Sequence, residues 1–340
     1  MSGVSAFTGS ADEWDAFVRS DPEGTFAHLA AWWPIMREAF GHEPLPLAVR
    51  DDRGALTGVL PLVHVSSRLF GKYLISMPFL NAGGPLGSPE ARKALAAEAE
   101  AEGRRRKVTL VELRNYGSAP DWGRVTDRKI TVHLPLPASE EPLWKEFPSK
   151  LRSQVRRAMR EGFDVRFGSA ELPAFYQVFT RNMRALGTPV LPRRVFEQIM
   201  TAFPGVAECA VVYDGATPIA GGVGFTWNGR FELMWASALR EYNSRAPNML
   251  LYWSLMQRAI ASGQHTFDFG RCTPGGGTHK FKRQWGGQDV PLPWTQWAPG
   301  DSHAPPSPDQ PIFRFASACW RKLPLAVTNR LGPIIATQLP

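Results

Sequence analysis

Two segments of this chain share one pattern, and that repeat constrains the fold more than any other feature. Residues 46–65 (PLAVRDDRGALTGVLPLVHV) and residues 208–227 (ECAVVYDGATPIAGGVGFTW) each read as an apolar strand, an Asp/Gly turn and a second apolar strand. Such turns between apolar runs predict β-hairpins. Each hairpin is followed, in the same order, by another strand, a loop, a helix and a strand. We therefore expect a tandem duplication of one α/β unit.

The second copy has the clearer element limits. Its strand at 231–240 leads through a loop into a helix that Pro247 starts and Gly263 stops, and a further strand follows. One face of that helix is apolar at helical spacing: Met249, Trp253, Met256 and Ile260. Residues 272–287 (CTPGGGTHKFKRQWGG) read as a Gly-rich loop with basic and aromatic side chains. A helix N-terminus after a strand directs backbone N–H groups at an anion, so the sequence predicts a small-molecule or nucleotide site here.

The first copy carries a different loop and helix at the equivalent place. The loop NAGGPLGSPE precedes a helix over Ala91–Glu102 that is expected to end at Gly103. This helix is rich in Ala and Glu, so it is poorly suited to binding an anion. Asn81 and the adjacent glycines either bind an acceptor or form the turn. Chemistry is therefore expected in the second half or in the groove between the halves.

Bulk composition bounds the class of protein. The 340 residues suffice for two cores, and 44% hydrophobic content with a mean hydropathy of −0.22 predicts a soluble globular chain. A net charge of +8 is compatible with an anionic partner, or simply with solubility. Three scattered cysteines indicate neither a disulfide framework nor a metal site. The acidic N-terminus and the absence of a long apolar run predict a cytoplasmic location.

Proline-rich segments suggest the boundaries. We expect an N-terminal domain over 1–145, a C-terminal domain over 146–300, and a linker and amphipathic tail over 301–340. The tail reads as able to pack on the body or to touch a membrane surface, with packing favoured.

An Arg-rich helix is predicted after the first boundary, capped by Ser149 and ending at Gly162. Leu151, Val155 and Ala158 form its apolar stripe. Arg152 and Arg156 lie on the neighbouring face, followed by a third arginine one turn on. Like charges at this spacing repel one another, so the face either binds an anion or is simply solvated.

Several motifs, taken in order, resemble the FemAB-like branch of the GNAT acyltransferase superfamily. The matching segments are 149–152, 160–162, 175–176, 181–184, 187–189, 210–225, 240–248, 267–271, 281–282 and 284–286. The sequence Trp-Arg-Lys-Leu-Pro at 320–324 is similar to the subgroup associated with exosortase and exopolysaccharide systems.

This resemblance implies an α/β fold with mixed sheets, built as two tandem GNAT domains. It also implies transfer of an acyl or aminoacyl group to an amine of a peptidoglycan or exopolysaccharide precursor, either a small molecule or lipid-linked. The donor would be aminoacyl-tRNA or acyl-CoA, with no tightly bound cofactor, no metal and no DNA partner. Where an acetyl-CoA loop carries glycines, this chain has Arg245-Ala-Pro-Asn248, which tilts the expectation toward tRNA.

The same resemblance assigns a donor site. Phe281-Lys282 matches the family's aromatic-Lys pair, associated with the nucleotide end of the donor. We expect Lys282 to contact donor phosphates, and Phe281 or Trp285 to stack on a base or line the acyl pocket. Core packing explains Trp285 equally well. Further donor-site candidates are Lys280, Arg240 and Asn248.

Three residues are candidates for catalysis. Asp268 alternates with two aromatic residues in FDFGR, so it is expected to face away from them, either orienting an amine or bonding local backbone. Arg271 is expected to pair with Asp268 or with a phosphate, and Tyr242 to protonate a leaving group. Candidates for the acceptor or anion site are Arg152, Arg156 and Asn81.

Two other functions fit the same residues. One is an acyl-CoA-dependent N-acetyltransferase that acts on another small molecule. The other is a non-catalytic adaptor that uses the tandem scaffold to bind nucleic acid or a partner protein.

Overall fold

The computed structural model describes residues 3–67, 70–126, 128–300 and 311–338, which form two compact units. The first unit comprises the described residues of 1–129, 291–310 and 334–340, and the second those of 130–290 and 311–333. These limits differ from the ranges expected from the sequence, because the segments near 130 and 294 each enter the sheet of the other half. The expected linker at 301–310 lies outside the described residues.

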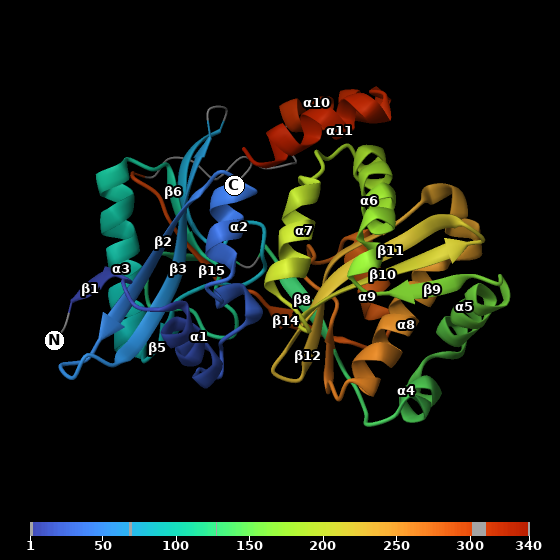
Figure 1. Ribbon diagram of the computed structural model, residues 1–340, viewed down its shortest axis with the longest axis horizontal. Coiled ribbons are helices and arrows are strands. Elements are labelled where there is room, and N and C mark those ends of the chain that lie inside the picture. The colour runs from blue at the N-terminus through green and yellow to red at the C-terminus, as the bar shows by residue number, and fades with distance from the viewer. Residues whose placement is uncertain (1–2, 68–69, 127, 301–310, 339–340) are drawn as a thin grey trace. The chain divides into compact units, whose positions relative to one another are not determined.

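The first unit is built on one mixed sheet whose strand order is β1-β2-β3-β4-β6-β15-β7, with β5 paired to β3. Helix α3 covers one face of this sheet, and α1 and α2 lie on the other (Figure 1). Its elements are β1 (Val4–Ala6), α1 (Ala11–Ser20), η1 (Phe26–His28), α2 (Trp32–Glu38), β2 (Glu43–Arg50), β3 (Leu56–Ser67), β4 (Gly71–Ser76), β5 (Leu86–Gly87), α3 (Pro89–Arg106), β6 (Leu110–Leu113), β7 (Arg124–Thr126) and β15 (Trp294–Trp297).

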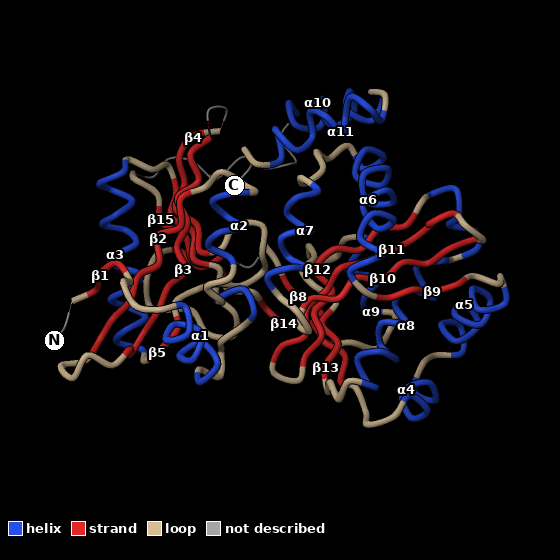
Figure 2. The backbone as a smooth tube through the Cα atoms, in the orientation of Figure 1, coloured by secondary structure: helices blue, strands red, loops and turns tan. Residues whose placement is uncertain are grey.

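The second unit repeats this plan with the strand order β14-β8-β13-β12-β11-β10-β9 (Figure 2). Helices α5 and α8 pack on one face of the sheet, and α6 and α7 on the other. Its elements are β8 (Ile130–Pro135), α4 (Glu140–Glu146), α5 (Ser149–Arg160), β9 (Asp164–Phe167), η2 (Ser169–Glu171), α6 (Leu172–Leu186), α7 (Arg193–Ala202), β10 (Ala207–Asp214), β11 (Thr217–Trp227), β12 (Arg230–Ala238), η3 (Arg240–Arg245), α8 (Pro247–Ala261), β13 (Thr266–Asp268), α9 (Gly277–Arg283), β14 (Gln288–Pro291), α10 (Pro311–Lys322) and α11 (Leu325–Ala336).

The duplicated order of elements that the sequence predicts is present in the structure. The hairpin β2–β3 corresponds to β10–β11, and both are antiparallel. Next, β4 pairs in parallel with β6 across the helix α3, as β12 pairs in parallel with β13 across α8. Asn228 and Gly229, both with positive φ, form the tight turn between β11 and β12. Pro247 begins α8 and Gly263, with φ 76°, follows its end, as predicted.

Each sheet also contains one strand supplied from the other side of the duplication. Strand β15 follows the second copy in sequence yet lies between β6 and β7, and β8 follows the first copy yet lies between β13 and β14. The incoming strand reaches a buried carboxylate in both sheets. Gln296 Nε2 is 2.6 Å from Glu112 Oε2, and His133 Nε2 is 3.0 Å from Asp268 Oδ2. Asp268 therefore has a counterpart in the first unit.

Two predicted helix limits were wrong. Ser149 is the first residue of α5 and makes no capping bond, because Pro148 takes the cap position. Helix α3 continues past Gly103 to Arg106 and ends at Lys107, which is in the left-handed region. Gly103 instead allows close packing, since a Cβ there would lie 2.6 Å from the side chain of Val111.

Candidate functional site

A pocket lies in the second unit where β12 runs beyond its partner β13. The two strands pair only from Arg230 to Glu232, although β12 continues to Ala238. Next to the end of β12 are residues at the starts of α8 and α9, and together they enclose about 330 Å³. The lining residues are Asn182, Ala236, Ser237, Ala238, Asn248, Leu251, Tyr252, Gly277, Thr278 and Phe281. Of the predicted donor-site residues, the pocket brings together Asn248 and Phe281.

Uncharged polar groups line this pocket. The Asn182 side-chain amide donates to Ser237 Oγ at 3.0 Å, which links α6 to the end of β12. Asn248 stands in the first turn of α8, where no side chain caps the helix. Amide and hydroxyl groups placed in this way can hold a carbonyl oxygen or a neutral amine. The sequence analysis missed Asn182 and Ser237, because strand and helix meet only in the folded unit.

Tyr252 is the residue in the pocket best suited to donate a proton. Its ring is buried, and it contacts Phe281 edge to face at a centroid distance of 4.9 Å. Burial raises the pKa of the phenol, so the hydroxyl keeps its proton at neutral pH. Among the described residues, no other group hydrogen-bonds to this hydroxyl. The apolar stripe predicted for this helix (Met249, Trp253, Met256 and Ile260) does not include position 252, which is why sequence reasoning did not single it out.

The predicted proton donor, Tyr242, lies outside the pocket lining. It belongs to η3, and its ring packs 5.9 Å from the guanidinium of Arg245. Arg245 forms ion pairs with Glu161, at 2.5 Å, and with Asp214. These contacts fix the loop that leads into α8. Arg240, also on η3, is exposed.

The segment predicted as a Gly-rich loop contains the short helix α9 (Gly277–Arg283), so the expectation of a loop throughout 272–287 was wrong. The cations of its last turn suit a helix C-terminus. Phe281 faces the pocket, whereas Trp285, just after the helix, is fully buried and packs in the core. Lys280 is exposed, and Arg283 bonds to the carbonyl of Gly287.

Lys282 occupies a different place from the predicted phosphate contact. Its ammonium group is buried and donates to the carbonyls of Gly270 and Arg271 at 2.5 and 2.9 Å. Burial lowers the pKa of Lys282, although the charges of nearby acidic groups oppose that shift. The side chain thus holds α9, and with it Phe281, against the end of β13. The Arg271 side chain is exposed.

Asp268 is a fully enclosed carboxylate. It faces away from the core residues Phe267 and Phe269, as predicted, and accepts hydrogen bonds from Thr131, His133 and the backbone of Gly270. Burial by itself raises the pKa of Asp268, but the hydrogen bonds of His133 and Thr131 and the charges of His133 and Arg230 together outweigh it, so the pKa falls below its usual value.

His133 is a further residue that sequence reasoning missed. It is the only partner of Asp268 among these three that is itself titratable, and its ring is partly exposed. It lies 135 positions before Asp268, on the strand β8 that enters the sheet from the first half. No local pattern in the sequence signals this pair.

The predicted anion-binding arginines also lie outside the pocket lining. Leu151, Val155 and Ala158 are buried on α5, as their spacing predicts. Arg156 is exposed and its guanidinium lies 5.4 Å from the ring of Trp144. Arg152 is half-buried on the same helix.

The equivalent region of the first unit is filled by protein atoms. After β4 the chain turns through Met77 and Phe79, both with positive φ. The Arg114 guanidinium bonds to the carbonyl of Leu80 at 3.0 Å and to Glu112 at 2.9 Å. Asn81 is buried, and its carbonyl accepts a bond from the Trp294 indole at 3.1 Å.

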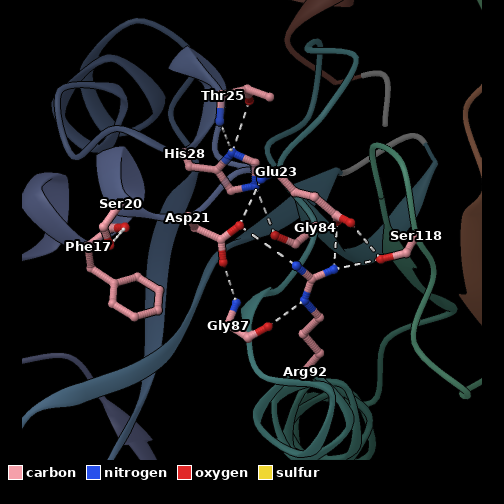
Figure 3. A network of polar contacts seen from close by, with 10 residues as sticks. All are labelled: Phe17, Ser20, Asp21, Glu23, Thr25, His28, Gly84, Gly87, Arg92 and Ser118. Carbon is pink, nitrogen blue, oxygen red and sulfur yellow. Dashed lines mark hydrogen bonds and ion pairs between the residues drawn. The ribbon is translucent and has the colours of Figure 1, made fainter. Parts of the chain in front are cut away.

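The loop before α3 is held further by the polar network in Figure 3. Arg92 bonds to the carbonyl of Gly87 at 2.8 Å and to Glu23 at 2.6 Å, while Asp21 accepts from the Gly87 N–H at 2.8 Å. The buried His28 accepts from Thr25 and donates to the Gly84 carbonyl at 3.0 Å. These contacts support the view that the glycines here form a turn.

Within the described ranges, no three or more His, Cys, Asp or Glu side chains group so as to hold a metal ion. No helix in those ranges is long and apolar enough to cross a membrane.

Comparisons with known proteins agree with this architecture. Residues 149–283, which include all the pocket-lining residues, match the family model described as Acetyltransferase (GNAT) domain. No curated protein matches the chain in sequence. Residues 149–283 are thus similar to this acetyltransferase domain family, and the chain is an acyltransferase with a tandem GNAT fold.

Solved structures extend the similarity to the whole chain. FemX is 17% identical with a TM-score of 0.64, and the match covers 92% of this chain and 100% of FemX. The C-terminal domain of a putative lysylphosphatidylglycerol synthetase from Agrobacterium fabrum is 12% identical with a TM-score of 0.57, and the match covers 86% of this chain and 92% of that domain. A tandem GNAT protein from the clavulanic acid biosynthesis pathway is 12% identical with a TM-score of 0.55 and coverage of 89% and 100%.

Proposed function

We propose that this acyltransferase moves an acyl or aminoacyl group to an amine of a cell-envelope precursor, either of peptidoglycan or of an exopolysaccharide. The observation that carries the proposal is the pocket at the end of β12. It combines amide and hydroxyl groups with an enclosed phenol, next to an uncapped helix N-terminus. Such a site suits a neutral amine and a polarised carbonyl better than a charged substrate.

In this proposal each pocket residue has a separate role in the transfer reaction. The Asn182 amide and Ser237 hydroxyl bind the carbonyl oxygen of the donor, where negative charge develops when the amine attacks. The Tyr252 phenol donates its proton to the leaving group of the donor as the bond from the carbonyl carbon to that group breaks, and the phenolate then takes up the proton that the attacking amine releases. Phe281 and Leu251 line the apolar part of the acyl site. Lys282 keeps α9 in place and acts through that position.

The Asp268–His133 pair lies outside the pocket lining. We propose that it holds the neighbouring strands β8 and β13 together and so acts on the site only through the fold. Its carboxylate is enclosed by three donors, and its counterpart Glu112 has a similar place in the first unit. A pair found in both units fits a structural requirement of the fold better than a role in transfer.

Support for an envelope acceptor comes from the neighbours. One similar structure is named for a synthetase of lysylphosphatidylglycerol, an aminoacylated membrane lipid. The positive charge of the chain also suits acceptors that carry phosphate. Both aminoacyl-tRNA and acyl-CoA remain donors in this proposal, because no pocket-lining residue is charged.

The match to an acetyltransferase domain favours a second candidate function, an acyl-CoA-dependent N-acetyltransferase of another small molecule. The two candidates separate by donor. The affinity for tRNA should fall steeply with salt, by about tenfold for every two or three phosphate contacts when the salt concentration rises from about 50 to 200 mM. The affinity for acyl-CoA should fall less, because acyl-CoA offers fewer phosphates.

The test offers purified protein labelled acyl-CoA or charged tRNA together with envelope-precursor extracts, and mass spectrometry identifies the added group. We expect a mass increase on an amine-bearing precursor. The Ala238→Trp variant, which fills the pocket, should abolish it, whereas Val125→Trp at an exposed position should not. Full transfer by Ala238→Trp would refute the pocket as the site.

A further inference from the structure

The two C-terminal helices present apolar stripes to solvent. On α10 the residues Ile312, Phe315, Ala316 and Cys319 recur at helical spacing and are exposed. Ile312 is 69% exposed and Phe315 is 72% exposed. On α11 the exposed residues are Val327, Leu331 and Ile334, again at one helical spacing. An apolar stripe normally faces a core, so an outward stripe indicates a contact surface.

The opposite sides of these helices are already fixed to the second unit. Arg184 on α6 donates to the carbonyl of Leu323 at 2.5 Å, just after α10. Gly187 ends α6, and a Cβ at that position would lie 2.6 Å from the Ser317 carbonyl. Gly332 on α11 approaches Val190 in the same way. Because packing holds one side of each helix, the stripes on the other side stay exposed.

Charge identifies what these stripes fit. Residues 311–340 carry four cations, Arg314, Arg321, Lys322 and Arg330, and no Asp or Glu. Three of these cations lie on α10, the helix that carries the first stripe. On α11, Arg330 adjoins the second stripe. An apolar stripe with cations and no acidic side chain is complementary to the headgroup region of an anionic lipid bilayer.

We infer that α10 and α11, the red helices of Figure 1, dock this chain on the surface of an anionic membrane. Their apolar stripes enter the headgroup boundary, and the cations contact lipid phosphates. Neither helix spans the bilayer, in agreement with their lengths of 12 residues each. The inference does not rest on the proposed acyl transfer, because the tail lies outside the pocket lining.

The test is co-sedimentation of the full chain with vesicles of phosphatidylcholine alone or with about a third phosphatidylglycerol. We expect binding to the anionic vesicles only. The double variant Ile312→Asp/Phe315→Asp should reduce the partition coefficient at least about tenfold, since two apolar side chains leave the boundary. The matched variant Val125→Asp/Met159→Asp, at apolar residues 55% and 48% exposed outside the tail, should bind like the wild type.

A second variant tests the charge separately. Arg314→Gln/Lys322→Gln keeps the apolar stripes and should weaken binding about fivefold for each cation that contacts the surface. Cys319 is exposed while Cys209 and Cys272 are buried, so a polarity-sensitive dye at Cys319 should shift to the blue on anionic vesicles.

Three results would overturn the inference. The first is no binding to anionic vesicles, and the second is an equal loss of binding in the Val125/Met159 control. The third is a concentration-dependent dimer, measured by light scattering, that Ile312→Asp/Phe315→Asp dissociates, since the stripes would then cover a second copy. Vesicle binding is a separate measurement from acyl transfer. Tyr252→Phe should bind anionic vesicles like the wild type, so a failure of the proposed function would leave the vesicle result unchanged.

Discussion

The loop before α3 and the loop before α8 hold the same place in the duplicated order, but they are built differently. In the first unit, β4 stops at Ser76, and Arg114 and Trp294 fill the space beyond it. In the second unit, β12 continues to Ala238, and the corresponding region encloses the pocket. Side chains thus fill the strand-to-helix junction of the first unit, whereas the junction of the second unit has room for a ligand.

The two units also use their buried charges differently. Arg114 is buried in the first unit and neutralises Glu112. In the second unit, no arginine stands at the equivalent place, where Gly270 follows β13 by two residues. The Gly270 carbonyl instead receives Lys282 from α9. Arg114, together with Trp294, therefore closes the junction of the first unit, whereas the glycine at the equivalent place leaves the junction of the second unit open.

Removal of the Arg114 side chain should have the largest effect on the difference between the two units. Arg114→Met should lower the free energy of unfolding by about 3–5 kcal/mol, because it leaves the carboxylate of Glu112 buried without its cation. Urea denaturation measures this loss. Transfer per folded molecule should be unchanged, and adding Glu112→Gln should restore part of the stability. Loss of transfer without loss of stability would place the active site in the first unit.

The first unit should also be the acid-sensitive one. Burial lowers the pKa of His28 to about 4 from its usual 6.5. Between those values the unfolded chain binds a proton that the folded chain does not, so stability falls as pH drops. The loss should reach roughly 3 kcal/mol at pH 4. His42, whose pKa burial also lowers to about 4, adds to this trend.

Replacement of His28 by glutamine tests this expectation. Gln can accept from Thr25 and donate to the Gly84 carbonyl, yet it takes up no proton. Urea denaturation between about pH 4 and pH 7 should give a flatter profile for His28→Gln than for the wild type. His265→Gln, at an exposed position in the second unit, serves as the control. An unchanged profile in His28→Gln would contradict the prediction.

In the second unit the largest effect should fall on rate. Tyr252→Phe removes only the hydroxyl, so we expect kcat to drop about a hundredfold with little change in stability. The same substitution at the half-buried Tyr242, which packs outside the pocket lining, should have a small effect. Steady-state kinetics on the acceptor found by mass spectrometry measures both. A larger loss from Tyr242→Phe would restore that residue as the proton donor.

The smallest expected effect is on two lysines of α9, Lys282 and Lys280. It distinguishes a lysine that stabilises the helix from one that contacts the ligand. Lys282→Met keeps the stem but loses two hydrogen bonds, which should cost about 2 kcal/mol of stability. Lys280→Met, on the same helix but exposed, should leave stability unchanged. If Lys280→Met raises the KM for the donor while Lys282→Met does not, the exposed lysine is the phosphate contact. Equal stability of both variants would contradict the buried role of Lys282.

Much of the fold was predictable because its signals are local. The hairpins at 46–65 and 208–227, the turn at Asn228, and the limits of α8 follow from alternation, turn residues and helix stop signals. Helix α9 was missed because Gly275 and Gly276 before it and Gly277 at its start indicate a loop. The packing of Phe281 and Trp285 and the bonds of Lys282 stabilise a helix instead.

The sequence alone determined that the chain is duplicated, that its second copy carries the basic and aromatic segment at 272–287, and that Asp268 faces away from Phe267 and Phe269. The tertiary structure decided the rest. It put Asn182, Ser237 and Tyr252 around one pocket, and it joined Asp268 to His133 through a strand from the other half. Local periodicity fixes which face of an element is apolar, but only packing fixes which distant elements meet there.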